Sequence, residues 1–267
     1  MDNRDFLLNI FDTKAGIYAL HIIPSLAYGY GVGNPKLPKT YSGIHFVDTA
    51  SLLSIRQDVP EFISVSLNKH GEIIELGNNT NPCMHFESIE IGTWCKALLM
   101  NGDASMMEHT DIPFLFKRDD FNEFERLAKA ALSHLTVSWC AEQAHYHAQI
   151  LMSVRLDPPF KLNSAFYGYY NALQGIVLAS TGKFVHEAAA LSEVAVEVAT
   201  LYPVVLEKMV TGDFLSRREL SAAHFEVLKL NKTMHEAEET SDLPDEPSDE
   251  IIQSFDDELL RLRRALL

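Results

Sequence analysis

The segment IYALHII at 17–23 is followed by the loop PSLAYGYGVGNPKLPKTY at 24–41 and by the run IHFV at 44–47. Short apolar runs bounded by turn-forming residues predict β-strands, so two strands are expected on either side of this loop. Downstream, the alternating segment 62–67 and the segment 72–76 predict a β-hairpin with a four-residue connection. The loop 24–41 is long for a connection between strands, which indicates a functional role.

The later part of the chain has helical patterns. Apolar residues spaced three and four apart begin at Phe121 and predict a helix that runs to about Val154. Three more helices are predicted, and Pro203 should kink or break the second of them. Their ranges are 165–180, 185–201 and 216–239. An acidic linker at 240–247 then precedes a terminal amphipathic helix that Ser248 can cap.

The two patterns divide the chain near residue 115. The first part, 1–115, is predicted to be a small mixed sheet with flanking helices, one of them over 91–100 and stopped at Gly102. The second part, 116–267, is predicted to be entirely helical. The sequence therefore predicts an α+β fold.

Composition excludes several classes of protein. The 267 residues hold 22 Lys and Arg against 37 Asp and Glu, a formal net charge of −15. Broad nucleic-acid binding and binding to anionic membranes are therefore not expected. Three cysteines without CxxC spacing, Cys83, Cys95 and Cys140, are interpreted as reduced core thiols. No apolar run is long enough to span a bilayer, and the N-terminus lacks a basic leader, so a cytoplasmic location is predicted.

Several stretches, taken in order, resemble one known family. They are PSLAYG at 24–29, PKTYSGI at 38–44, GDASMME at 102–108 with Pro113 behind it, and SDLPDEP at 241–247. The set resembles the predicted nucleotidyltransferases of the DNA polymerase β superfamily found in bacteria and large tailed phages. Their fingerprint is Gly-Ser-x-Ala-Tyr-Gly, then Ser-Asp-x-Asp-x-x-Gly, then Gly-Asn-x-x-x-x-Glu. The resemblance implies a nucleotidyltransferase-like sheet and, for any retained nucleotide site, the residues Ser25, Ala27, Tyr28 and Gly29.

The departures from this fingerprint concern the catalytic metals. The resemblance implies two Mg²⁺ ions held by the Asp-x-Asp pair, and those positions are Pro38 and Thr40 here, neither of which offers a carboxylate. Glu108 is the one acid of the pattern that is retained. The loss of both bridging acids predicts a catalytically inactive protein that needs no cofactor.

An alternative keeps the enzyme active. Other acids would then hold Mg²⁺, and a nucleotide would be transferred from a nucleoside triphosphate to protein or RNA. The residues of this alternative are Asp48, Glu87, Glu90 and Glu108 for the metal, with Ser25 and Lys36 or Lys39 for the triphosphate. A sensor that binds nucleotide without turnover is a third possibility.

An inactive member is expected to act by binding a protein partner, as an adaptor or recruitment factor. Eleven acids and no Lys or Arg stand between Lys232 and Arg261, which is typical of a solvated linker or of a docking surface for a basic partner. The aromatic run near residue 167 is a second candidate surface, unless it packs in the core. The candidate partner-binding residues are Tyr167, Tyr169, Tyr170, Glu238, Glu239, Asp245 and Glu246.

The family's distribution adds a hypothesis about the setting. It suggests a phage-encoded protein that serves phage–host interaction or protein sorting in an infected bacterial cell. Whether the last helix packs on its own chain or on another molecule stays open at this point, as do the partner's identity and the oligomeric state.

Overall fold

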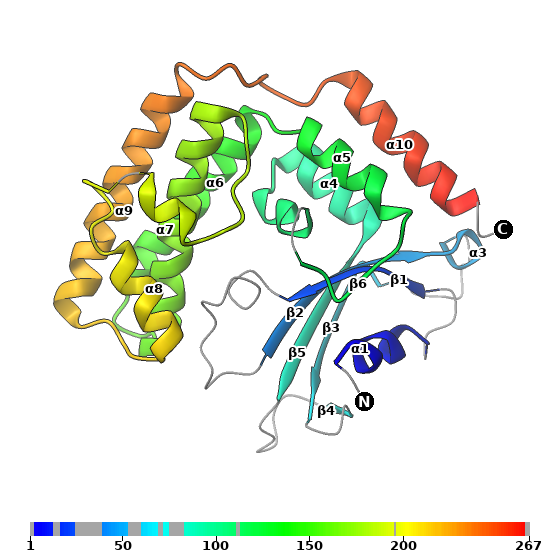
Figure 1. Cartoon of the computed structure of the whole chain (residues 1–267), viewed down its shortest axis with the longest axis horizontal. Helices are drawn as coiled ribbons and strands as arrows, with labels where there is room; N and C mark the ends of the chain where they lie inside the picture. The colour runs from blue at the N-terminus through cyan, green and yellow to red at the C-terminus, as the bar shows by residue number, and fades with distance from the viewer. Residues whose placement is uncertain are drawn as a thin grey trace.

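The computed structural model describes residues 3–12, 17–24, 39–52, 60–68, 72–74, 83–110, 113–194 and 196–264. Within these ranges the chain forms a mixed sheet with helices on both faces, followed by a helical part (Figure 1). The predicted α+β fold is confirmed. None of the described helices combines the length and hydropathy required to cross a membrane.

Six strands form one sheet in the order β4-β3-β5-β2-β1-β6. β2 and β5 run parallel and the other neighbours are antiparallel, so the sheet is mixed as predicted. The strands are β1 (Ile17–Pro24), β2 (Lys39–Val47), β3 (Phe62–Leu67), β4 (Ile73–Ile74), β5 (Met84–Glu90) and β6 (Phe116–Lys117). The predicted antiparallel pairing of β3 and β4 is confirmed, but β4 begins at Ile73, so five residues connect the strands and not four.

The two faces of the sheet are covered by different helices (Figure 1). On one face, Leu7, Ile10 and Phe11 of α1 (Asn3–Asp12) pack against strand residues such as Ile22 and Phe86. On the other face, α4 (Ile91–Asn101), the 3₁₀ turn η1 (Ala104–His109) and α5 (Phe121–Ala130) share a core with strand residues. A short helix, α3 (Thr49–Leu52), follows β2.

The helical part is built around three long helices that pack on one another. They are α6 (His134–Leu151), α7 (Pro158–Thr181) and α9 (Arg217–Glu238). The turn η2 (Ala190–Glu193) and the helix α8 (Tyr202–Thr211) lie between α7 and α9 in the chain. Gly175 of α7 lies at this junction, because an added Cβ would stand 2.0 Å from Met234 Sδ of α9. An alanine at Gly175 would require the Met234 side chain to move, and its Cβ would also stand 3.1 Å from Cys140 Cβ of α6.

Two predicted helices differ from the structure. The helix expected from Phe121 to Val154 is two helices, because α5 ends at Ala130 and α6 begins at His134. The range 185–201 holds turns and the short η2 instead of a long helix. Pro203 does not kink a helix there but lies in the first turn of α8, where its missing N–H is not needed.

Smaller differences concern the strands and one thiol. Residues 39–41 belong to β2, so they are not part of the predicted loop, and residues 25–38 lie outside the described residues. β5, β6, α1 and α8 were not predicted, and β6 shows that the range 116–267 is not entirely helical. Cys95 and Cys140 are buried as expected, whereas Cys83 is exposed and is therefore not a core thiol.

The terminal helix α10 (Asp249–Arg264) packs on its own chain, which answers the question that the sequence left open. Its Phe255 contacts Trp94 of α4 and Phe124 of α5, with ring centroids 6.4 and 6.3 Å apart. Arg263 pairs with Glu90 at the start of α4 (3.5 Å). After the helical part, the chain thus returns to the helices that cover the sheet (Figure 1).

Candidate functional site

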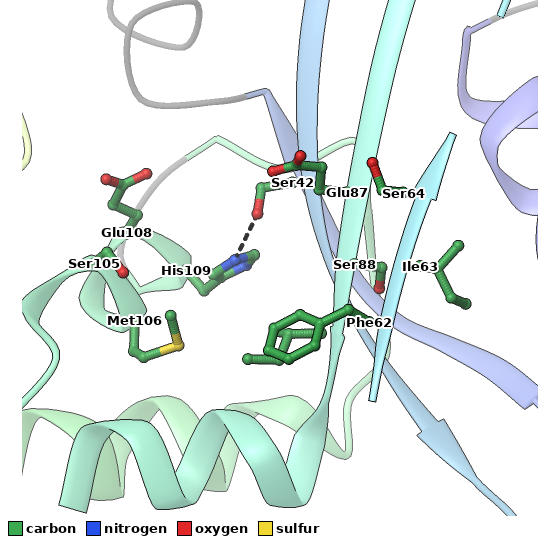
Figure 2. Close-up of a pocket in the computed structure, with 11 residues that line it drawn as sticks. Ser42, Phe62, Ile63, Ser64, Glu87, Ser88, Ser105, Met106, Glu108 and His109 are labelled. Carbon is green, nitrogen blue, oxygen red and sulfur yellow. Dashed lines mark hydrogen bonds between the residues drawn. The ribbon is translucent and has the colours of Figure 1, made fainter. Parts of the chain in front are cut away.

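A cavity of about 320 Å³ lies between the sheet and η1. β2, β3 and β5 form one wall and η1 forms the opposite wall (Figure 2). The lining residues are Ser42, Phe62, Ile63, Ser64, Glu87, Ser88, Ile89, Ser105, Met106, Glu108 and His109. The volume is within the range of small ligand sites, and the lining combines polar groups with apolar side chains. This cavity is therefore the candidate site.

Strand register places the polar side chains of the sheet wall together. Ser42 of β2 and Ser64 of β3 are both direct neighbours of Glu87 on β5. Residues paired across neighbouring strands project to the same face, so the two hydroxyl groups flank the carboxylate. Ser88 follows Glu87 and projects the other way, where its hydroxyl bonds His45 Nδ1 (2.9 Å).

A chain of two buried histidines extends from Ser42 into the core. Ser42 Oγ lies 3.0 Å from His109 Nε2, and His109 Nδ1 lies 3.4 Å from His21 Nδ1. His21 also stacks on Phe121 of α5, with ring centroids 4.6 Å apart. The local cause is a bulge in β1 between Ala19 and His21, which turns both Leu20 and His21 toward the helices.

Both histidines are held neutral. Burial, together with the nearby His109 and Lys117, lowers the pKa of His21 to about 2. Burial lowers the pKa of His109 to about 3. With neutral rings, one nitrogen of each donates and the other accepts, so Ser42 can either donate to His109 or accept from it.

Glu108 supplies a carboxyl group of unusual basicity to the opposite wall. Its side chain is half-buried, and burial, reinforced by the charge of Asp103, raises the pKa of Glu108 to about 8. Asp103 begins η1 by accepting from the backbone N–H and the hydroxyl of Ser105 (3.0 and 2.6 Å). Glu108 is therefore mostly protonated at neutral pH, whereas Glu87 projects from the sheet opposite.

The structure describes only part of the predicted nucleotide and metal site. Ser25, Ala27, Tyr28, Gly29 and Pro38 lie outside the described residues. Thr40 is on β2, in register with His85. Its half-buried side chain offers a hydroxyl group and no carboxylate.

Two acids of the alternative metal site have structural roles. Asp48 accepts from Ser51 N (2.6 Å), and Glu90 caps α4 by accepting from Gly92 N (2.7 Å). Glu87 and Glu108 both line the cavity. Among the residues that the structure describes, no three His, Cys, Asp or Glu side chains gather where they could hold a metal ion.

The candidate partner-binding residues divide into buried and exposed groups. Tyr169 and Tyr170 are buried in the helical part, and Tyr167 is half-buried against His147, so this aromatic run packs in the core and is not an exposed platform. Glu238 contacts Ser138 and His134 of α6, and so joins α9 to that helix. The three remaining candidates are exposed: Glu239, Asp245 and Glu246.

Sequence patterns did not reveal the core of the site. Ser42, His109 and His21 were not predicted. His109 is 67 positions from Ser42 and 88 positions from His21, so the three meet only through strand pairing and the bulge. A local signal did exist for Glu108, which belongs to the GDASMME stretch that was used for the resemblance.

Comparisons with known proteins found no sequence match and a weak structural similarity. No family model matches this sequence, and no curated protein matches it. Among solved structures, the chain is similar to a nucleotidyltransferase-like protein from Exiguobacterium sibiricum. The two are 8% identical, the match covers 90% of this chain and 78% of the other, and the TM-score is 0.37. Identity and TM-score are too low to assign a role to any residue of this chain.

Proposed function

We propose that this chain is a catalytically inactive nucleotidyltransferase-like protein that acts by binding another protein, as an adaptor or recruitment factor. The observation that carries the proposal is the run of exposed carboxylates between α9 and the middle of α10. Its exposed members are Glu239, Asp242, Asp245, Glu246, Asp249, Glu250, Asp256 and Asp257. A long anionic segment without Lys or Arg of its own attracts a basic partner and speeds its association.

The state of the metal positions supports the first half of the proposal. Two-metal phosphoryl transfer needs several carboxylates around one point. Here Thr40 replaces one of them, while Asp48 and Glu90 are engaged as helix caps. The proposal places the protein in the cytoplasm, and its wider form assigns it to phage infection, where protein sorting or phage–host contact would supply the partner.

Thermal unfolding tests the expectation that the chain does not bind nucleotides. With ATP, GTP, CTP or UTP, each with and without Mg²⁺, the midpoint of unfolding should equal that of the matching nucleotide-free control. A ligand at about 100 times its dissociation constant would add roughly 2.7 kcal/mol, which such a melt detects. A shift that requires both nucleotide and Mg²⁺ would support the alternative, an active metal-dependent nucleotidyltransferase.

Partner binding is tested by neutralising the exposed acids. The triple variant Glu239→Gln, Asp245→Asn, Glu246→Gln should bind the partner captured from the native cell about tenfold more weakly than the unaltered chain. Exposed ion pairs contribute about 0.2–1 kcal/mol each, and their loss is additive for separated sites. The control is Glu207→Gln, which removes an exposed acid from α8. Equal binding by the triple variant would exclude this segment as the docking surface.

A further inference from the structure

The charge of the cavity between the sheet and η1 limits what it can bind. Two carboxyl groups, of Glu87 and Glu108, line it, and no Lys or Arg lines it among the described residues. An anion such as a phosphate would meet like charge without a compensating cation, which is unfavourable. A ligand that carries hydrogen-bond donors and positive charge fits this lining.

The geometry of the two walls defines where a cation would lie. Glu87 stands between the hydroxyl groups of Ser42 and Ser64 on the sheet wall, and its contact with His85 (3.0 Å) uses Oε1 and leaves Oε2 for another donor. Glu108 projects from η1 opposite (Figure 2). Both groups line the same cavity, so a cation bound there would be attracted to each of them.

The apolar part of the lining suits an alkyl stem. Phe62 lines the cavity with 64% of its surface exposed, although large aromatic side chains are usually covered. Met106 lies on the facing wall, below Ser105 in Figure 2. An aromatic face attracts a nearby cation, and a flexible thioether packs on methylene groups.

We propose that this cavity receives an arginine or lysine side chain of the partner protein, with its charged group between Glu87 and Glu108 and its stem along Phe62 and Met106. This inference rests on the proposed function, because it specifies one contact of the same basic partner. This contact is made in the cavity, whereas the proposed function was argued from the exposed acidic segment.

Binding of such a cation is coupled to loss of a proton. Glu108 carries a proton at pH 7 because its pKa is about 8, and a bound cation favours the carboxylate. The titratable groups that interact with Glu108 are Asp103, which precedes η1, and Tyr167 on α7, while Glu87 with its partner His85 lies on the opposite wall. His109 stays neutral, because its pKa is about 3. Affinity should therefore rise by about tenfold from pH 7 to pH 9, with release of close to one proton at pH 7.

The test uses the full chain and two matched probes. Nα-acetyl-L-arginine amide should bind, as measured by calorimetry and by chemical-shift changes of η1 and β5 amides. Nα-acetyl-L-citrulline amide, which has a similar shape and no charge, should not. The double variant Glu87→Gln, Glu108→Gln should bind the arginine probe at least tenfold more weakly, and Phe62→Ala should weaken it severalfold. Glu207→Gln should bind like the unaltered chain.

The pH series separates the titrating groups. In Glu108→Gln, the affinity for the arginine probe should no longer rise between pH 7 and pH 9. In His85→Gln, it should still rise over this range. Glutamine resembles the protonated, neutral side chain of Glu108, so the variant is expected to fold and its binding can be measured. A pH dependence that survives in Glu108→Gln would contradict the proposed proton release.

Each of the following results would overturn the inference. They are equal binding of the arginine and citrulline probes, equal binding by the double variant, and the absence of any shift at about 10 mM probe, where even millimolar affinity is visible. Tighter binding of putrescine than of the arginine probe would show a free polyamine site instead of a protein contact. If the double variant captures the partner normally and the acidic-segment variant does not, the inference fails while the proposed function stands.

Discussion

Acid should destabilise this protein strongly through one pair of residues, His21 and His109. We expect the free energy of unfolding to fall by about 3–5 kcal/mol between pH 7 and pH 4.5 because of this pair. In the unfolded chain both rings take up protons below about pH 6.5. In the folded chain their pKa values are about 2 and 3, so neither ring does. The stabilisation is therefore present above pH 6.5 and is lost as the pH falls toward 3.

Urea unfolding at a series of pH values measures this loss. The double variant His21→Asn, His109→Gln replaces both titrating rings with amides that keep hydrogen-bonding groups. It should be less stable at pH 7, where it loses packing on Phe121, but its stability should change less between pH 7 and pH 4.5. His145→Gln is the control, because His145 is exposed on α6 and bonds only its neighbour Gln149 in the described contacts. An unchanged slope in the double variant would disprove the assignment.

Glu108 acts in the opposite direction over part of this range. Its pKa in the folded chain is above its unfolded value, so the folded state binds the proton more tightly and loses stability as the pH rises toward 8. The histidine pair and Glu108 together predict a stability maximum on the acid side of neutrality. The candidate site is thus the part of the molecule where folding and titration are most closely linked.

Local sequence rules predicted the elements whose ends depend on local chemistry. Gly102 and Gly182 end α4 and α7 with positive φ angles, which only glycine adopts readily. Ser216 begins α9 by accepting from Glu219 N, and Glu219 reaches back to Ser216 N. In each case one or two neighbouring residues determine the boundary.

The same rules failed where packing determines the boundary. The apolar stripe includes Ala131, Leu132 and Leu135, so the periodicity alone does not separate α5 from α6. The separating signal is Ser133, whose backbone N–H donates to Thr136 Oγ1 (3.4 Å) in a capping arrangement. In 185–201 the helical pattern instead belongs to turns that bury Ala188 and Leu191 against α7 and α8.

The site shows the limit of sequence reasoning most clearly. β1 was predicted as a strand, yet the role of His21 depends on the bulge, which re-aims one side chain. Glu87 was considered as a metal ligand, and the structure places it between two serines through strand register. Such arrangements depend on contacts across the fold, which no local pattern encodes.

Gly102 should be far less tolerant of substitution than Gly182, although both end a helix with φ near +60° (62° and 66°). A Cβ on Gly102 would lie 2.3 Å from the carbonyl carbon of Leu135, in the backbone at the start of α6. A Cβ on Gly182 would meet nothing nearer than Leu243 Cδ2 at 3.9 Å. Both alanine variants have the same left-handed strain, about 1–2 kcal/mol, so their difference isolates the clash.

We expect Gly102→Ala to lower the free energy of unfolding by about 3–5 kcal/mol and Gly182→Ala by about 1–2 kcal/mol, measured by urea unfolding at pH 7. Equal losses in the two variants would mean that α6 does not approach Gly102 this closely. Because Gly102 is followed directly by Asp103 and η1, the first variant should also displace Glu108 and His109 and weaken binding of the arginine probe. The glycine of the GDASMME stretch is thus required by helix packing, and that packing holds one wall of the cavity in place.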